Sequence, residues 1–252
     1  MRVKAILSYD GNFFQGFQKQ TRTQNTIVAS LESALHSLNI KGSIVGSGRT
    51  DTGVHATGQV IHFDLPNFWT DRKKLQQELN RKLRHIRIKH ITKVDNTFHA
   101  RFSAKRRIYR YVFKQKKPSL FEENYVAHYP YFDQALLQHS IEAFEGEHDF
   151  HYFHKTGSNI HTTVRKIYKT RYKQFADYHI LYFEANGFLR AQVRMMIDTA
   201  MRCASGQLTL EMLREQINGT QHYNTSLAPA SGLYLARIIY DIKIKPPISI
   251  LR

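Results

Sequence analysis

Apolar and polar residues alternate along residues 3–10, where Val3, Ala5, Leu7 and Tyr9 fall on one face. A period of two is typical of a strand with one buried side. The same reading of the first 104 residues predicts further strands over residues 43–45, 59–65 and 86–94.

A period of three to four replaces the alternation between these strands. Ile27, Leu31 and Leu35 fall on one stripe, and Asn25 stands where an N-cap is expected, so a helix is predicted from there to Leu38. A polar helix with a weak leucine stripe is predicted over residues 71–84.

The second half of the chain gives a similar order of elements. Ala176 and Asp177 separate two strand-like runs, which predicts a hairpin. Strands are predicted over residues 108–114, 164–172, 178–185 and 232–242, and helices over 133–144, 188–204 and 210–217.

Each half therefore contains the order β-α-β-β-α-β. We expect an α+β fold in which two pseudo-repeated halves form a mixed, mostly antiparallel sheet with helices packed on it. A catalytic cleft is expected between the halves. The predicted domains are residues 1–104 and 105–252.

Charge narrows the class of partner. Lys and Arg number 37 against 20 acidic residues, a formal net charge of +17. A polyanion relieves the self-repulsion of such a surface, so nucleic acid is favoured. No membrane association is expected, because the sequence has no apolar run of spanning length and no basic amphipathic helix. The single cysteine, Cys203, excludes an internal disulfide framework and is consistent with a reducing, cytoplasmic compartment.

The most unusual segment is the glycine-rich run over residues 46–60, with Arg49 and Asp51 near its centre. Glycines allow sharp turns and the close approach of another molecule. An arginine beside an aspartate favours the ionised carboxylate, which suits a nucleophile or a base. The alternative is an Asx-turn, in which Asp51 accepts hydrogen bonds from Thr52 or Gly53.

Two other motifs fit this segment poorly. Gly48 and Gly53 have the spacing of a P-loop, but Val54 and His55 stand where Lys and Ser or Thr are required. The tripeptide that begins at Asp51 is that of aspartic proteases, which need two such carboxylates, and only one copy occurs.

The segment resembles the signature loop of the TruA-type tRNA pseudouridine synthases, with Thr52 in place of the usual alanine. Further similar blocks occur in the same order along nearly the whole chain, although Phe17 replaces a tryptophan. The blocks are Tyr9-Asp10-Gly11, Gly16-Phe17-Gln18, residues 98–104, Tyr109-Arg110-Tyr111, Phe188-Leu189, Val193-Arg194 and residues 231–235.

The resemblance implies roles for individual residues. Asp51 matches the essential aspartate, and Arg49 the loop arginine that assists base flipping. Tyr109 matches the tyrosine that stacks on the target uracil, and Arg194 the arginine that pairs with the aspartate across the cleft. Phe188 and Leu189 are expected to wall the pocket, and His55 to order the loop or contact the substrate.

Three of these residues also have a purely structural alternative. Tyr109 shares its strand face with other aromatic residues and fits a core position. Asp198, where the family usually has glycine, is four positions after Arg194 and offers an ordinary helix ion pair. His55 fits a packed, hydrogen-bonded histidine. Three nearby histidines could suggest a metal site, but their spacing does not form a good tetrahedral ligand set: His148, His151 and His154.

For substrate, the resemblance implies uridines 38, 39 and 40 in the anticodon arm of tRNA. It also implies a homodimer and an isomerisation that needs no cofactor, metal or nucleotide. The alternative from another class is a tRNA-binding or chaperone protein without catalytic activity.

Overall fold

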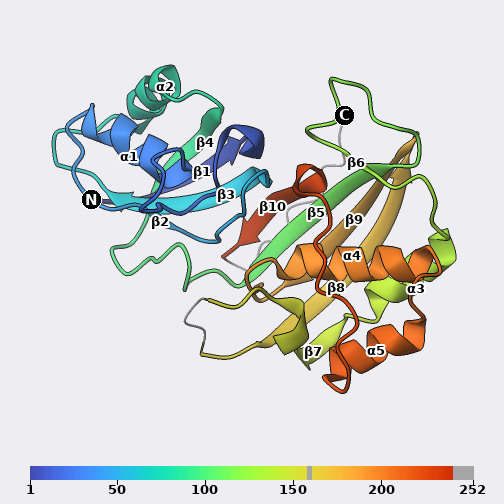
Figure 1. The fold of residues 1–252 in the computed structure, drawn as a ribbon. Helices are drawn as coiled ribbons and strands as arrows, with labels where there is room; N and C mark the ends of the chain where they lie inside the picture. Colours follow the sequence, from blue (N-terminus) through green and yellow to red (C-terminus); the bar gives the residue numbers. More distant parts are fainter. Residues whose placement is uncertain (158–160, 241–252) are drawn as a thin grey trace.

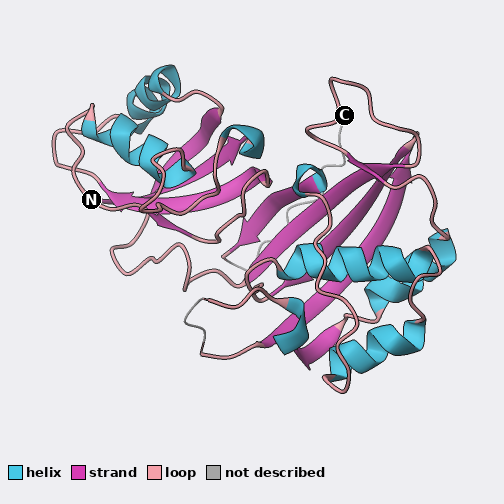
Figure 2. Ribbon diagram, in the orientation of Figure 1, coloured by secondary structure: helices cyan, strands magenta, loops and turns pink. Residues whose placement is uncertain are grey.

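The computed structural model describes residues 1–157 and 161–240, and its strands form one continuous sheet (Figures 1 and 2). The order along the sheet is β4-β1-β3-β10-β5-β9-β8-β7, with β2 paired to β3 and β6 to β5. The strands are β1 (Arg2–Tyr9), β2 (Val45–Gly46), β3 (His55–Asp64), β4 (Ile86–Lys93), β5 (Arg106–Lys114), β6 (Ala127–His128), β7 (Gly146–Asp149), β8 (Val164–Phe175), β9 (Tyr178–Ala185) and β10 (Leu233–Ile239).

Within the described residues, five α-helices pack on this sheet. Helices α1 and α2 lie at the end formed by β4, β1 and β3, whereas α3 and α4 lie over β5, β9 and β8 and α5 packs beside them near β7 (Figure 1). The helices are α1 (Ile27–His36), α2 (Arg72–Lys82), α3 (Gln134–Glu142), α4 (Gln192–Ala204) and α5 (Leu210–Asn218).

In the first half, β1 alternates strictly between buried and half-buried positions, as its sequence period predicts. Its buried side faces the stripe of α1, where Ile27, Leu31 and Leu35 are almost fully buried. The N-cap of α1 is Thr26 and not Asn25: the Thr26 side chain accepts from the Ala29 amide. Apolar periodicity locates a helix but tolerates an error of one residue at its end.

In the second half, the predicted hairpin is confirmed, with Ala176 in the left-handed region at φ 52° between β8 and β9. Helix α4 begins at Gln192, four residues later than predicted. Ala191 has φ 62°, so the chain does not continue as a helix toward Phe188. The preceding residues form a loop instead.

Strand β10 joins the two halves. It pairs antiparallel with β5 and parallel with β3, where Tyr234 is the register partner of His55 and Leu235 that of Ala56. The last described strand therefore lies in the middle of the sheet, directly beside the strand that follows the glycine-rich loop.

The predicted α+β class and mixed sheet are confirmed. The halves pair their strands alike: β1 lies antiparallel between β3 and β4, and β5 antiparallel between β9 and β10. The domain boundary stays a prediction, and residues 241–242 of the last predicted strand lie outside the described residues. None of the described helices has the length and apolarity needed to cross a membrane.

Candidate active site

The glycine-rich loop leaves the sheet after β2 and returns as β3. Its base is fixed by the Ser47 amide, which donates to Val60 O at 2.8 Å, and by Gln59 Nε2, which donates to Gly48 O at 2.7 Å. At its tip the Val54 amide donates to Asp51 O, and Gly53 has φ 77°. The turn is thus closed by the backbone carbonyl of Asp51.

The carboxylate of Asp51 accepts no hydrogen bond among the described residues, so the Asx-turn alternative does not describe this loop. The Asp51 side chain is 34% exposed. Its Oδ2 lies 3.7 Å from Arg194 Nη1, which comes from the first turn of α4. The pair therefore links the loop of the first half to a helix of the second.

Arg194 is held in place by the backbone of another segment. Its Nε donates to Ala228 O at 2.7 Å, and the Ala228 amide donates to Arg194 O. Ala228 is fully buried, which makes this a rigid support. The guanidinium thus has one edge anchored and the other directed toward Asp51.

Asp198 does not compete for Arg194. Its Oδ2 accepts from Arg202 Nε at 2.8 Å and from Asn224 Nδ2 at 3.0 Å. The i, i+4 pair on this helix therefore forms one turn later than the sequence suggested, and Arg194 remains beside Asp51.

Arg49 is exposed and forms no ion pair among the described residues. The guanidinium within ion-pair distance of Asp51 belongs to Arg194, although Arg49 is only two positions away in sequence. Arg49 is therefore available to an external partner.

Tyr109 lies on β5 at the end of a row of three aromatic side chains. Tyr111 and Phe113 are fully buried in the core, whereas Tyr109 is 7% exposed and borders the loop. A Cβ placed on Gly48 would lie 3.9 Å from Tyr109 Oη. Phe188 packs edge-on against the Tyr109 ring, with centroids 5.2 Å apart. Burial raises the pKa of Tyr109 above its ordinary value; Tyr9 and Asp51 raise it further, whereas the charge of Arg107 lowers it.

The loop between β9 and α4 supplies Phe188 and Leu189. Phe188 is half-buried and Leu189 is buried. The Leu189 amide donates to Gln192 Oε1 at 2.7 Å, which ties this loop to the start of α4. The loop thus contacts Tyr109 through Phe188 and is tied to the first turn of α4, which carries Arg194.

His55 is 2% exposed, and both of its ring nitrogens have protein partners. The Gly11 amide donates to Nδ1 at 3.1 Å, and Nε2 lies 3.0 Å from Asn124 O, so Nε2 carries the proton. Burial lowers the pKa of His55, which favours this neutral form. The ring links β3 to the segment after β5 and has no nitrogen free for a substrate.

The sequence reading missed a buried polar group beneath the loop. Tyr9 Oη lies 2.8 Å from Thr50 Oγ1, and Gln59 Nε2 donates to Tyr9 Oη at 3.4 Å. The Phe17 amide donates to Thr50 O at 3.0 Å, and a Cβ on Gly46 would lie 2.4 Å from the Phe17 ring. The available signal was Gln59, a polar residue directly before the apolar pair Val60 and Ile61.

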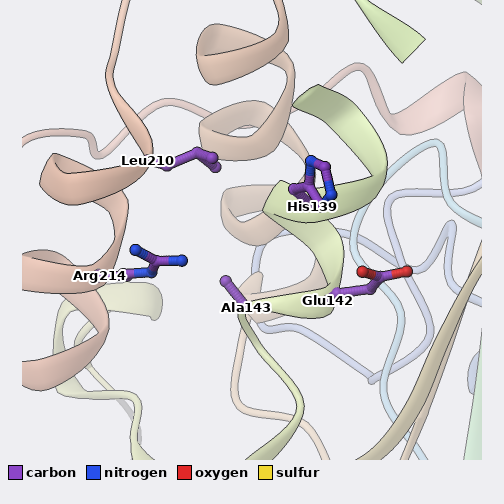
Figure 3. A pocket seen from close by; sticks show the side chains of 5 residues that line it. All are labelled: His139, Glu142, Ala143, Leu210 and Arg214. Carbon is purple, nitrogen blue, oxygen red and sulfur yellow. The ribbon is translucent and has the colours of Figure 1, made fainter. Parts of the chain in front are cut away.

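Two other features lie apart from this region. No group of three metal-binding side chains occurs in residues 1–157 and 161–240; His148 and His154 contact backbone carbonyls instead. The hollow of about 500 Å³ in Figure 3 lies between α3 and α5 and contains none of the predicted site residues. It is lined by His139, Glu142, Ala143, Leu210 and Arg214.

A family model described as tRNA pseudouridine synthase matches residues 5–103 and 141–241 of this chain. The chain belongs to the tRNA pseudouridine synthase family. Enzymes of this family are isomerases. The matched ranges include Asp51 and Arg194 and leave out the segment that carries Tyr109.

Relatives named tRNA pseudouridine synthase A are similar over nearly their whole length. The one from Helicobacter hepaticus is 39% identical over 94% of this chain and 98% of that protein. One from Campylobacter jejuni is 38% identical over 95% and 100%, and one from Geobacillus sp. is 36% identical over 95% and 98%. A solved structure titled as a Cbf5-Nop10-Gar1 complex matches 78% of this chain and 44% of that chain with a TM-score of 0.35 and 11% identity, too weakly to bear on the synthase fold.

Proposed function

We propose that this chain isomerises uridines 38, 39 and 40 in the anticodon arm of tRNA to pseudouridines, with Asp51 as the catalytic carboxylate. The observation that carries the proposal is the position of Asp51: partly exposed, unbonded by backbone amides, and 3.7 Å from Arg194 on the other half of the molecule. A carboxylate in this setting has its lone pairs available to a nucleoside.

The reaction moves one bond within a single nucleoside. The C1′–N1 bond breaks, the uracil rotates, C5 bonds to C1′, and the proton on C5 is lost while N1 gains one. Atoms and electrons balance without an oxidant or a metal, so the proposal includes no cofactor. Asp51 acts by adding to the ring, attacking C1′ or removing a ribose proton, and each route requires an ionised carboxylate.

Arg194 supports that role through its charge. A cation near a carboxylate stabilises the ionised form, and the Ala228 carbonyl fixes the guanidinium before substrate arrives. Preorganised charge costs no rearrangement at the moment of reaction. Arg194 is thus the positioned counter-ion of Asp51.

The remaining residues receive the flipped base. Extruding a uridine costs a few kcal/mol, and stacking on an aromatic ring returns about 1–3 kcal/mol. Tyr109, with Phe188 edge-on beside it, offers that ring. Leu189 excludes water, Arg49 contacts the RNA backbone, and His55 orders the loop.

The proposed assembly is a homodimer that binds tRNA in the cytoplasm through its basic surface. The net charge of +17 supports recognition through backbone phosphates and RNA shape.

The test is pseudouridine formation in an unmodified tRNA transcript by the native chain and by Asp51→Asn, which keeps the side-chain shape and removes the charge. Asp95→Asn is the matched control, because Asp95 is exposed and bonds only its own turn. We expect the native chain and the control to convert anticodon-arm uridines, and Asp51→Asn to bind without converting. Binding by all three without conversion by any would favour the tRNA-binding or chaperone alternative.

A further inference from the structure

Arg107, two positions before Tyr109, has its guanidinium enclosed by backbone carbonyls. Nη1 donates to Asn186 O at 2.8 Å, Nη2 to Arg101 O at 2.8 Å, and Nε and Nη2 both approach Ser47 O. These carbonyls come from three separate segments around the candidate site. The N–H groups of Arg107 therefore have acceptors, but these carbonyls carry no net charge and do not neutralise the guanidinium.

A second guanidinium, that of Arg165 on β8, lies beside the first. A Cβ built on Gly187 would be 3.7 Å from Arg165 Nε and 4.0 Å from Arg107 Nη1, so both groups flank the same point. Nη1 of Arg165 donates to the carbonyls of Thr162 and Val164, which leaves its Nε side toward Gly187. Gly187 itself adds no side chain to fill the space.

Arg101 adds a third positive charge to this group. It is exposed, and its guanidinium lies 5.7 Å from the centroid of the Phe102 ring. Burial lowers the pKa of both Arg107 and Arg165, and the charge of Arg101 lowers both further. None of the three forms an ion pair with a carboxylate of the described residues, although each is within the field of another.

These three guanidiniums repel one another and have no counter-ion among the described residues, so a bound anion would reduce their repulsion. Guanidinium is the preferred partner of phosphate oxygens, because its N–H groups match them in pairs. The location is also informative, since Gly187 directly precedes Phe188, which packs on Tyr109.

We propose that Arg165 binds a backbone phosphodiester of the RNA at Gly187, on a floor formed by Arg107 and with the charge of Arg101 as further support, next to the flipped uridine. This inference rests on the proposed function for the identity of the anion. A phosphate held here fixes the strand beside the target nucleotide, so that Tyr109 and Asp51 receive a base whose backbone is already located.

The first test measures tRNA affinity against salt concentration for the native chain, Arg165→Gln and Arg214→Gln. Arg214 is the matched control, because it is an exposed arginine on α5 in the separate hollow of Figure 3. We expect Arg165→Gln to weaken binding about tenfold and to make the slope of log affinity against log salt shallower by about 0.7–0.9, the loss of one phosphate contact. Arg214→Gln should change neither. Equal effects of the two variants, or an unchanged slope for Arg165→Gln, would overturn the proposal.

The second test locates the phosphate. Anticodon stem-loops are prepared that each carry one neutral methylphosphonate beside the target uridine. Their binding to the native chain is compared with their binding to Arg165→Lys, which keeps the charge but loses the paired N–H donors of the guanidinium. One modification should weaken native binding about tenfold and Arg165→Lys binding less. No sensitive position in the native chain contradicts the site.

Inorganic phosphate at constant ionic strength distinguishes a small-anion site. If millimolar phosphate raises the melting temperature of the native chain but not of Arg165→Gln, while the salt slope for tRNA is the same in both, the site binds free phosphate and the RNA assignment is wrong. All these readouts are binding measurements. A native chain that binds with the predicted slope but converts no uridine would contradict the proposed function and leave the phosphate site standing.

Discussion

Tyr234 is the register partner of His55 across two parallel strands, and their rings stack with centroids 4.7 Å apart. His55 begins β3, and Tyr234 belongs to β10, the strand that pairs with both β3 and β5. The end of the glycine-rich loop is therefore fixed directly against the second half of the chain. The relative position of Asp51 and Arg194 depends on this junction.

Arg194→Lys should lower the rate of uridine conversion at least about tenfold, a barrier increase of about 1.4 kcal/mol. A lysine cannot donate to Ala228 O and face Asp51 with the same fixed geometry. Arg202→Lys, which affects the pair with Asp198 on the same helix, is the control and should stay within about twofold. Single-turnover conversion measures both, and equal losses would contradict the role of Arg194.

Tyr109→Phe should retain tRNA affinity within about twofold, because stacking uses the ring and not the hydroxyl. Tyr109→Ala should lose about tenfold or more in affinity. Direct binding to a tRNA transcript measures both variants. Complete loss of binding by Tyr109→Phe would show that the ring has been assigned the wrong contact.

Gly58→Ala should destabilise the fold by at least about 2 kcal/mol, because its Cβ would lie 2.3 Å from Ala236 O at the junction of β3 and β10. Gly48→Ala is the matched comparison. Its Cβ meets Leu235 and Tyr109 at ordinary contact distances of 3.8 and 3.9 Å, so stability should change by less than about 0.5 kcal/mol. Conversion should still fall about tenfold, because the methyl group occupies space beside Tyr109. Urea unfolding and conversion rates together separate the two outcomes.

Stability should fall as pH falls below about 6.5, partly through His62. Burial, followed by the charges of Arg2 and His99, lowers the pKa of His62 to about 4. The folded state therefore favours the neutral ring, whose contribution is complete above the unfolded pKa and is lost as pH falls from 6.5 toward 4. Between pH 7 and pH 5 this loss is about 2 kcal/mol.

Urea unfolding of the native chain and of His62→Gln at the two pH values checks this prediction. The variant should lose less stability than the native chain, whereas His154→Gln, at a histidine near the surface, should behave like the native chain. An equal pH dependence in all three proteins would exclude His62 as the source.

Local patterns predicted much of the fold. The alternation in β1 and the stripe of α1 reflect burial of one face, which each segment records in its own sequence. The cap at Thr26 and the late start of α4 depend on the backbone angles of single residues, such as Ala191, and periodicity does not contain that information. The short strands β6 and β7 went unrecognised because two to four residues are too few to show a period.

The site shows the same division. Residue types around Asp51 indicated a carboxylate that needs a cation. Proximity in sequence suggested Arg49, whereas the family resemblance implied Arg194, and Arg194 is the arginine that the fold brings within 3.7 Å of Asp51. That pairing depends on the parallel contact of β3 with β10, a long-range event that no local pattern encodes. The carbonyl shell around Arg107 is equally non-local, since its acceptors come from three segments.

The central position of β10 has a consequence for synthesis of the chain. Until the residues after 232 have left the ribosome, the parts of β3 and β5 that pair with β10 have no partner on that side, and such edges invite pairing with other chains. The two half-sheets of the nascent protein therefore stay unjoined until β10 emerges and pairs with both of them. A chain released before that strand would have two half-sheets that are not joined, so it would be prone to aggregate and would not form the complete sheet.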